Sequence, residues 1–207
     1  FKQSDGSAVV STGVLRINTQ DALVNTDSLL FSRNHLDVTA SHINSSRGKM
    51  VSEKGRLTVD ARGRDLISEQ GLLKGGSAVS LKSGNLNNRA GRIESGGELS
   101  LQTQTVNNDQ AVVFSRLGAH IQSLAFSNKG GKVHSSEGGL ALDTQGQQVD
   151  NQNGRISARQ DLTVSSAQLD NRGGLLRSET DITLNTQQQA LLNTQTLNEP
   201  LSVGIVA

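Results

Sequence analysis

Few side chains in this sequence could carry out chemistry. The sequence is a tandem repeat, and these side chains do not recur at one position of the repeat. Histidine could ligate a metal ion or transfer a proton, but the four histidines occupy different repeat positions; they are His35, His42, His120 and His134. Asp161 and Asp181 come nearest to the recurring carboxylates that a polysaccharide-cleaving β-helix enzyme would need for acid and base catalysis. Each precedes a predicted strand, where a solvated outward charge is sufficient. We therefore assign no catalytic, cofactor-binding or metal-binding residue.

Composition argues against several further kinds of site. The 207-residue chain has no cysteine, which removes disulfides, zinc–thiolate sites and thiol nucleophiles. Its 20 Lys and Arg residues nearly balance 19 Asp and Glu residues, and no basic run occurs, so nucleic-acid binding is not expected. No stretch approaches the roughly 18 apolar residues of a membrane span, so membrane insertion is not expected. The chain begins at Phe1 without a signal peptide, and we expect it to be a piece of a longer protein.

A tandem repeat of about 20 residues organises the sequence. Its clearest copies are LISEQGLL, LNNRAGRI, VNNDQAVV, FSNKGGKV, VDNQNGRI and LDNRGGLL, which begin at Leu66, Leu86, Val106, Phe126, Val149 and Leu169. Weaker copies begin at Phe1, Leu23 and Ile43, and successive copies start 20 to 23 residues apart. Repetition at this period is typical of solenoid proteins, in which each unit packs only on its neighbours.

Two small or polar columns of the repeat are candidates for a structural role. The third position is mostly asparagine, at Asn25, Asn88, Asn108, Asn128, Asn151 and Asn171, with Gln3, Ser45 and Ser68 as departures. Three residues later the column is mostly glycine, at Gly6, Gly48, Gly71, Gly91, Gly131, Gly154 and Gly174. Both residue types tolerate a positive φ and are typical of turns. If equivalent strands stack about 4.8 Å apart, the asparagines should form an amide ladder.

Apolar residues fill the remaining columns and predict the fold. Each unit contains an alternating pair such as Leu99 and Leu101, which indicates a strand with one buried face. One unit buries four or five aliphatic side chains at roughly 1.5–3 kcal/mol each, which cannot offset about 1–2 kcal/mol per residue for ordering its backbone. The units must therefore stack. The prediction is an all-β, right-handed parallel β-helix of nine to ten rungs, about 43 Å long for nine rungs.

Other folds fit the sequence less well. Disorder would suit the many Ser, Asn, Gln and Gly residues but not the periodic apolar columns. A leucine-rich solenoid needs an L-x-x-L-x-L run and a segment of helical period in each unit, and neither occurs. A calcium-binding β-roll needs GGxGxD repeats, and the Gly-Gly pairs of this chain lack the following Gly and Asp.

Length variation is predicted to lie in turns on the outside of the stack. Units with three additional residues carry them largely at residues 62–64 and 145–147, while the apolar columns keep their register. We expect the β-helix of nine tandem repeats to cover residues 1–190. Residues 191–207 depart from the pattern and contain the single proline, Pro200. This segment is predicted to be a degenerate last rung or a transition to another region.

The units VDNQNGRISARQDLTVSS and LDNRGGLLRSETDITLNTQ resemble the repeats of filamentous haemagglutinin-type exoproteins. The resemblance rests on a tandem [L/V]-[D/N]-N-x-x-G-x-[I/L] pattern over about residues 1–190. These exoproteins are the large secreted partners of bacterial two-partner secretion systems, and they include adhesins and contact-dependent growth-inhibition toxins. The resemblance implies a β-helical shaft at the surface of a Gram-negative cell and export through an outer-membrane two-partner-secretion transporter. It assigns no catalytic residue to the repeats.

The sequence thus predicts a structural stalk that presents adhesive or toxic domains to a receptor on a host cell or a neighbouring bacterium. The alternative is a direct adhesin that binds host glycan or protein, because the outward position after the second apolar column includes Val9, Phe31, Val51 and Phe114. The simpler interpretation is that Phe31 covers its own sheet face. A polysaccharide-cleaving enzyme is the remote alternative, since no turn is long enough to wall a substrate groove.

Overall fold

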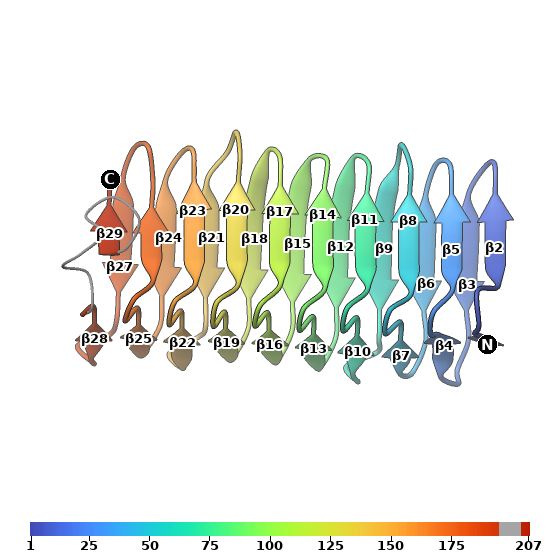
Figure 1. Cartoon of the computed structure of the whole chain (residues 1–207), viewed down its shortest axis with the longest axis horizontal. Coiled ribbons are helices and arrows are strands. Elements are labelled where there is room, and N and C mark those ends of the chain that lie inside the picture. Colours follow the sequence, from blue (N-terminus) through green and yellow to red (C-terminus); the bar gives the residue numbers. More distant parts are fainter. Residues whose placement is uncertain (195–203) are drawn as a thin grey trace.

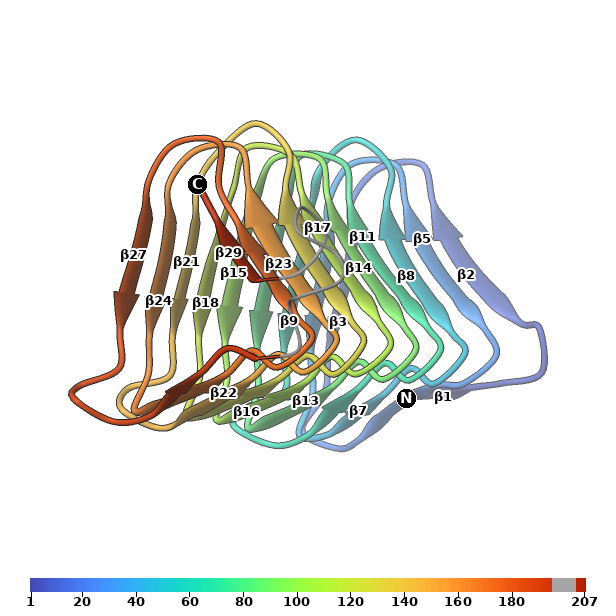
Figure 2. The same ribbon diagram turned by 60° about the vertical axis from the view of Figure 1, so that its left-hand side comes forward.

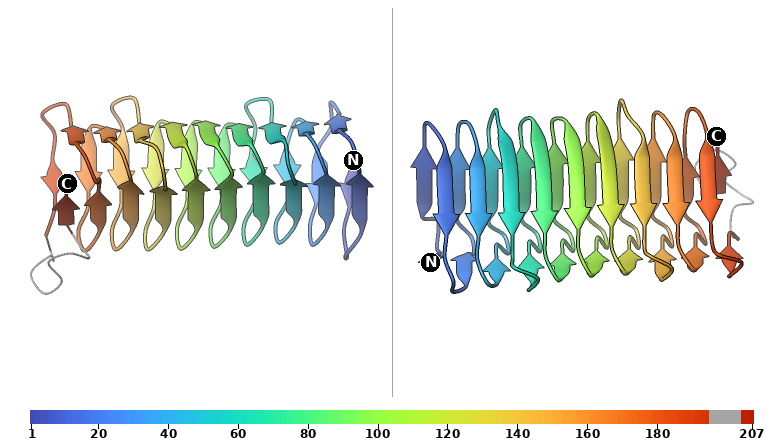
Figure 3. Two further views of the ribbon diagram at one scale, coloured as in Figure 1. Left: turned by 90° about the horizontal axis from the view of Figure 1, so that it is seen from above. Right: turned by 180° about the vertical axis from the view of Figure 1, so that it is seen from behind.

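The chain forms a right-handed parallel β-helix, which confirms the predicted fold class. This computed structural model describes residues 1–194 and 204–207. The chain rises through one sheet, returns through a second and crosses a short third sheet before the next rung begins (Figure 1). Figure 2 shows the three-sided cross-section, and Figure 3 shows that the rungs follow one another along a single axis. The described residues contain no helix that is long and apolar enough to cross a membrane.

Each rung contributes one strand to each of three parallel sheets. Sheet A is formed by β1 (Lys2–Gln3), β4 (Leu23–Asn25), β7 (Ile43–Asn44), β10 (Leu66–Ile67), β13 (Asn85–Asn87), β16 (Thr105–Asn107), β19 (Ala125–Ser127), β22 (Gln148–Asp150), β25 (Gln168–Asp170) and β28 (Leu191–Leu192). Sheet B is formed by β2 (Ala8–Ser11), β5 (Leu29–Ser32), β8 (Lys49–Ser52), β11 (Leu72–Gly75), β14 (Arg92–Ser95), β17 (Val112–Ser115), β20 (Lys132–Ser135), β23 (Arg155–Ala158), β26 (Leu175–Arg177) and β29 (Gly204–Val206). Sheet C is formed by β3 (Leu15–Asn18), β6 (Leu36–Thr39), β9 (Arg56–Asp60), β12 (Ala78–Lys82), β15 (Glu98–Gln102), β18 (Gly118–Gln122), β21 (Leu140–Asp143), β24 (Leu162–Ser165) and β27 (Ile182–Asn185).

The apolar columns lie in register, as the repeat predicts. In sheet C, Leu99 pairs with Val79 on one side and with Ala119 on the other. Leu99 and Leu101 point into the core, whereas Ser100 between them is exposed. Because side chains alternate across a strand, this period of two places one apolar row inside and one polar row outside. The core is therefore one narrow stack of aliphatic residues, and Phe126 is the largest fully buried side chain.

The corners of the rungs are filled by small residues, and one such column is not evident from the sequence repeat. A serine column at the end of sheet B includes the buried residues Ser32, Ser52, Ser95, Ser115, Ser135 and Ser178. A second buried column follows sheet C and contains Ala40, Ala61, Ser83, Thr103, Ser123, Thr144 and Ser166. Because these positions carry Ala, Ser or Thr, no single residue type marks them. Small side chains are favoured where the chain turns inside a close-packed core.

The first rung corrects the alignment of the repeat. Ala8 pairs with Leu29, and Val9 pairs with Leu30, so Val9 is the inward residue that packs on the core. The outward residue is Val10, which is 61% exposed. Gly6 consequently lies one residue before the column to which we assigned it. The physical reason is an additional residue in the turn, where Asp5 and Gly6 have φ values of 58° and 78°.

Additional residues in the longer rungs lie in two turns rather than one. Registers place Met50 beside Leu73 and Leu57 beside Val79, so one residue is added between sheets B and C and two are added after sheet C. The pair after sheet C includes Arg62 and Gly63, whose φ values of 50° and 73° turn the chain outward. The prediction that insertions lie in turns is confirmed, and their distribution is refined.

The segment after residue 190 continues two of the three sheets. Leu191 of β28 pairs with Leu169, and Ile205 of β29 pairs with Leu176. Sheets A and B therefore contain ten strands and sheet C contains nine among the described residues. Pro200 lies outside the described residues. The division of the chain at residue 190 stays a proposal.

Candidate functional site

The asparagine column lies inside the β-helix, where each rung leaves sheet A. All six predicted asparagines are fully buried: Asn25, Asn88, Asn108, Asn128, Asn151 and Asn171. A buried amide has two donor hydrogens and one acceptor oxygen, and each unpaired group costs free energy. The stacking of identical rungs provides partners for most of these groups.

Five of these asparagines form a continuous ladder. The Nδ2 group of each donates to the Oδ1 atom of the next rung, from Asn88 to Asn108 at 2.8 Å and from Asn108 to Asn128 at 2.7 Å. The same bond joins Asn128 to Asn151 and Asn151 to Asn171, at 2.7 Å in both cases. All bonds in this series point toward the C-terminal end, so the amide dipoles add along the axis.

The second hydrogen of the amide often ties the ladder to the backbone. Asn151 Nδ2 also lies 3.3 Å from the carbonyl oxygens of Gly154, in its own rung, and of Leu175, in the next rung. Asn171 makes equivalent bonds to Gly174 at 3.3 Å and to Gly204 at 3.2 Å. The asparagine side chain thus fixes the turn of its own rung and the position of the next one.

The ladder is interrupted at Ser68. Asn25 donates to Ser45 Oγ at 2.9 Å, so the first asparagine belongs to a separate short series that begins with Gln3. Within the described part of the chain, neither Ser68 Oγ nor Asn88 Oδ1 has a hydrogen-bond partner, although both are buried. The serine side chain is too short to reach the amide of the next rung. The six predicted residues therefore form two groups, with Asn25 in one and the other five together.

Two further members of the column lie at the outer ends of the two series. Gln3 donates to Asn25 Oδ1 at 2.8 Å, and Asn171 donates to Asn193 Oδ1 at 2.8 Å. In the sequence Gln3 departs from the asparagine column, and Asn193 lies in the segment that departs from the repeat. The Leu191-Leu192-Asn193 sequence, which repeats the apolar-x-Asn start of a unit, was the signal that could have identified it.

Replacement of Ser68 by asparagine should stabilise the protein. The new amide would donate to the unpaired Asn88 Oδ1 and accept from Ser45 Oγ, which joins the two series. Each new bond should contribute about 0.5–1.5 kcal/mol to the free energy of unfolding. Urea denaturation measures this gain, with Ser100→Asn on the exposed face of sheet C as the matched control. A Ser68→Asn variant no more stable than the control would contradict the proposed continuity of the ladder.

Removal of an amide from the middle of the ladder should have the opposite effect. Asn151→Leu leaves the Asn171 Oδ1 atom without its donor and deprives Asn128 Nδ2 of its acceptor. We expect a loss of about 1–3 kcal/mol for each of these two groups. Asn151→Ser should cost less, because Ser45 shows that a hydroxyl accepts from the preceding amide at 2.9 Å. Equal losses from leucine and serine, measured by urea denaturation, would count against a hydrogen-bonded ladder.

The predicted turn glycines have a different role from the one expected. Of the seven, only Gly6 has a positive φ; the left-handed position in other rungs lies one residue earlier, as at Arg47, Gln70 and Asn153. A Cβ atom on Gly154 would overlap the backbone oxygen of Asn128 in the preceding rung. The same overlap with the preceding rung occurs at the remaining predicted sites, which are Gly48, Gly71, Gly91, Gly131 and Gly174. These glycines are needed because two rungs approach closely and not because of an unusual φ.

Charged side chains form ion pairs within a rung and between neighbouring rungs on the outside of the helix. Arg172 donates to Asp170 at 2.6 Å, and this hydrogen bond holds the pKa of the Asp170 carboxyl below its ordinary value. Lys129 lies 3.0 Å from Asp150, whose carboxylate raises the pKa of the lysine by hydrogen bonding and charge. The cations are half exposed, so each pair contributes little to stability.

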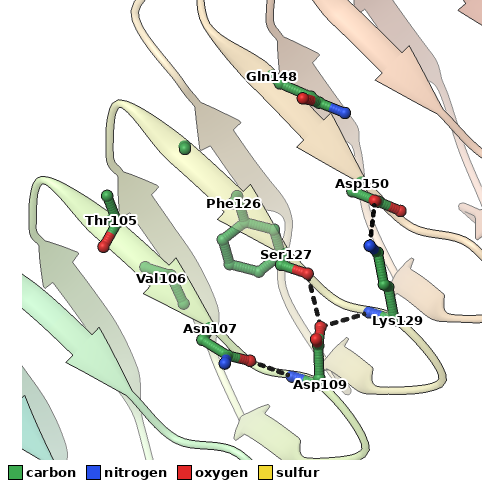
Figure 4. Close-up of a pocket in the computed structure, with 10 residues that line it drawn as sticks. Thr105, Val106, Asn107, Asp109, Phe126, Ser127, Lys129, Gln148 and Asp150 are labelled. Atoms are coloured by element: carbon green, nitrogen blue, oxygen red, sulfur yellow. Dashed lines mark hydrogen bonds and ion pairs between the residues drawn. The ribbon is translucent and has the colours of Figure 1, made fainter.

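A shallow pocket of about 350 Å³ lies on the outer side of sheet A (Figure 4). Within it, Asp109 accepts hydrogen bonds from the Ser127 hydroxyl at 2.6 Å and from the Lys129 backbone N–H at 2.9 Å. The carboxylates of this pocket are thus engaged by neighbouring rungs. We interpret the pocket as part of the surface that holds the rungs together.

The histidines do not come together in space. His35 accepts the backbone N–H of Arg56 at 3.1 Å, and His134 lies 2.9 Å from Ser157 Oγ. In residues 1–194 and 204–207, no group of three His, Cys, Asp or Glu side chains could hold a metal ion. Asp161 accepts a hydrogen bond from Thr180 at 2.6 Å and is exposed, as is Asp181. The contacts of His35, His134 and Asp161 each join neighbouring rungs of the stack.

One family model matches the chain. The model of the haemagglutinin repeat covers residues 3–27, 31–131 and 127–198. These ranges include every rung from the first strand of sheet A to the start of the tenth rung. No curated protein and no solved structure matches the chain.

Proposed function

The chain belongs to the haemagglutinin repeat family, which is characteristic of secreted, adhesin-type stalks, and from this premise we propose that it is a length of shaft within a large exoprotein. The shaft holds adhesive or toxic domains away from the surface of a Gram-negative cell. Its expected partner during export is an outer-membrane two-partner-secretion transporter. The functional domains of the exoprotein would contact a receptor on a host cell or a neighbouring bacterium.

The observation that carries this proposal is the unbroken stack of equivalent rungs. Each rung contacts only its neighbours, through the apolar columns and the asparagine ladder. Such a structure provides length and stiffness. Rungs can be added or removed without a change in the structure of the remaining rungs. The absence of cysteine also suits a chain that crosses the envelope unfolded and folds outside the cell.

The sequence of the complete exoprotein tests what the shaft carries. A toxin domain beyond these rungs, encoded beside a separate immunity protein, would indicate growth inhibition of neighbouring bacteria. Its absence would favour adhesion. A catalytic domain built from the rungs themselves would contradict the proposal that this region is a shaft.

A direct adhesin is the second candidate, and exposed apolar residues on sheet B favour it. Val10 is 61% exposed and is the neighbour of Phe31, which in turn is the neighbour of Val51. Phe31 and Val51 are mostly buried, which agrees with a covering role for these side chains. A screen of cell-surface glycans and proteins would separate the candidates. Binding that Val10→Ser or Phe31→Ser abolishes would support a direct adhesin over a simple shaft.

A further inference from the structure

Two neighbouring rungs carry positive charge at the same position on the outer face of sheet B. Lys132 of β20 pairs directly with Arg155 of β23 in the strand register. Both side chains are exposed, and neither makes an ion pair within residues 1–194 and 204–207. Like charges directly opposite each other in a sheet are unfavourable, so this cation pair calls for negative charge from outside its own rod.

A pair of aspartates shows how the chain compensates like charges elsewhere. Asp150 of β22 pairs with Asp170 of β25 in sheet A. Lys129 lies 3.0 Å from Asp150, and Arg172 lies 2.6 Å from Asp170, so each carboxylate has its own counter-ion. The cation pair on sheet B has no such counter-ion in the part of the chain that the structure describes.

The opposite side of the rod carries the reverse arrangement. Asp161 and Asp181 occupy equivalent positions directly before β24 and β27, where the Leu162 N–H donates to the Asp181 backbone oxygen at 2.9 Å. Both side chains are exposed, and neither makes an ion pair with another described residue. The cation pair lies on sheet B, which faces the viewer in Figure 1, and this anion pair lies at the start of sheet C, which faces the viewer in the right-hand view of Figure 3.

A hollow beside Asp161 gives the acidic side a shape that can receive a long side chain. It has a volume of about 420 Å³, and it is lined in part by Gly118 and Gly139, which have no side chains to fill it. Leu117 borders the hollow and is 41% exposed, and Glu98 adds a second carboxylate. The methylene stem of a lysine or arginine would pack on the leucine while its charged end reaches the carboxylates.

We propose that sheet B of one copy of the chain packs against sheet C of a second copy, with Lys132 and Arg155 beside Asp161 and Asp181. Each pair spans one step between rungs, about 4.8 Å, so the charges match when two rods lie side by side and point the same way. The cation pair lies in the seventh and eighth strands of sheet B, and the anion pair precedes the eighth and ninth strands of sheet C. The second rod is therefore offset along the axis by about one rung.

This contact can extend beyond two copies. The cation pair and the anion pair lie on opposite sides of the rod, so each copy can contact two neighbours at once. A contact between two different surfaces of identical chains, when it does not close into a ring, produces an open array. Rods that project in one direction from a common surface meet in the parallel orientation that the contact requires. The association goes beyond the proposed shaft function, and either one can fail while the other holds.

The test measures the mass of the purified chain by sedimentation velocity, at about 0.05 M salt and at about 1 M salt, where the screening length falls to roughly 3 Å. Lys132→Gln/Arg155→Gln removes the cation pair, and Asp161→Asn/Asp181→Asn removes the anion pair. The matched controls are Arg47→Gln/Arg89→Gln and Asp27→Asn/Glu69→Gln. They change the net charge equally but remove charges that are already paired within the rod. Circular dichroism checks that every variant keeps its β-structure.

We expect the parent to form species larger than a dimer at low salt and to become monomeric at high salt. Each interface variant should self-associate at least about tenfold more weakly for each of the two ion pairs that it loses, which is at the lower end for close charge pairs between proteins. The two controls should associate like the parent. An equimolar mixture of the two interface variants should form a one-to-one complex and nothing larger, because each variant keeps one working surface.

Several results would overturn the proposal. A parent that stays monomeric at low salt, or that associates equally at both salt concentrations, would show that these charges do not join two rods. Equal losses in the interface variants and the controls would assign any association to net charge alone. A parent that stops at a dimer, or a mixture of folded interface variants that forms no complex, would rule out a contact between the two opposite sides.

Discussion

Gly154→Val should destabilise the β-helix by about 3 kcal/mol or more, at the upper end of what overpacking costs. The reason is that the Cβ atom of any side chain at this position would overlap the backbone oxygen of Asn128 in the preceding rung. Neither the ladder asparagine nor the stacked backbone can move without loss of hydrogen bonds to both adjacent rungs. Valine adds two methyl groups that have no space in the same turn. Urea denaturation followed by far-ultraviolet circular dichroism measures the change.

Two controls separate close approach from other effects of glycine. Gly154→Ala should cost less than valine, since Ala111 and Ser28 occupy the same column in other rungs. Gly63→Asn should be nearly neutral, because this turn glycine has a φ of 73°, which asparagine tolerates, and its Cβ would meet no atom within 4 Å. Similar losses at Gly154 and Gly63 would show that rung contact is not the constraint.

Deletion of one whole rung should leave a folded protein, whereas deletion of half a rung should not. Removal of Val106–Ala125 joins Thr105 to Phe126, so Phe126 takes the place of Val106 above Leu86. All three sheets keep their register, and only nearest-neighbour contacts of one unit are lost. We expect a β-rich spectrum and a slightly lower free energy of unfolding.

Removal of Val106–Ser115 deletes β17 and most of β16 but leaves β18. Sheets A and B then lose a strand that sheet C retains, and the asparagine ladder loses Asn108. The rungs on either side cannot stack in all three sheets, so aliphatic core residues become exposed to water. We expect this variant to aggregate, or to unfold at a temperature well below the unfolding temperature of the parent protein. Equal stability of the two deletions, measured by thermal unfolding, would contradict a register-dependent solenoid.

Most of the fold could be predicted from the sequence because each core position is repeated nine times. The column that contains Leu57, Val79 and Leu99, for example, consists of aliphatic residues. Stacking brings these equivalent positions into direct contact. The first rung was misaligned because its column residue is Ser7 and a glycine happens to precede it. The position of one additional residue in a single copy cannot be found from the sequence when the residues on both sides of it are polar.

The details of the candidate sites could be predicted less well. The sequence marks both Ser45 and Ser68 as departures. Only the side-chain geometry shows that Ser45 is the last member of a hydrogen-bonded series and that the Ser68 hydroxyl has no partner in the described residues. The sequence shows glycine in this column, but not that the column is in close contact with the preceding rung, as between Gly154 and Asn128, 26 positions earlier.

The central claim is that these rungs serve as a spacer, and one measurement tests it most directly. The complete exoprotein is compared with a variant that lacks Leu66–Ala125, which are three rungs in register, and the activity of its functional domain is measured per exported molecule. We expect export and activity to be unchanged, and the shaft to be shorter by about 14 Å. Loss of activity from a variant that is exported and folded would show that these rungs carry a specific site, and would contradict the account of a shaft.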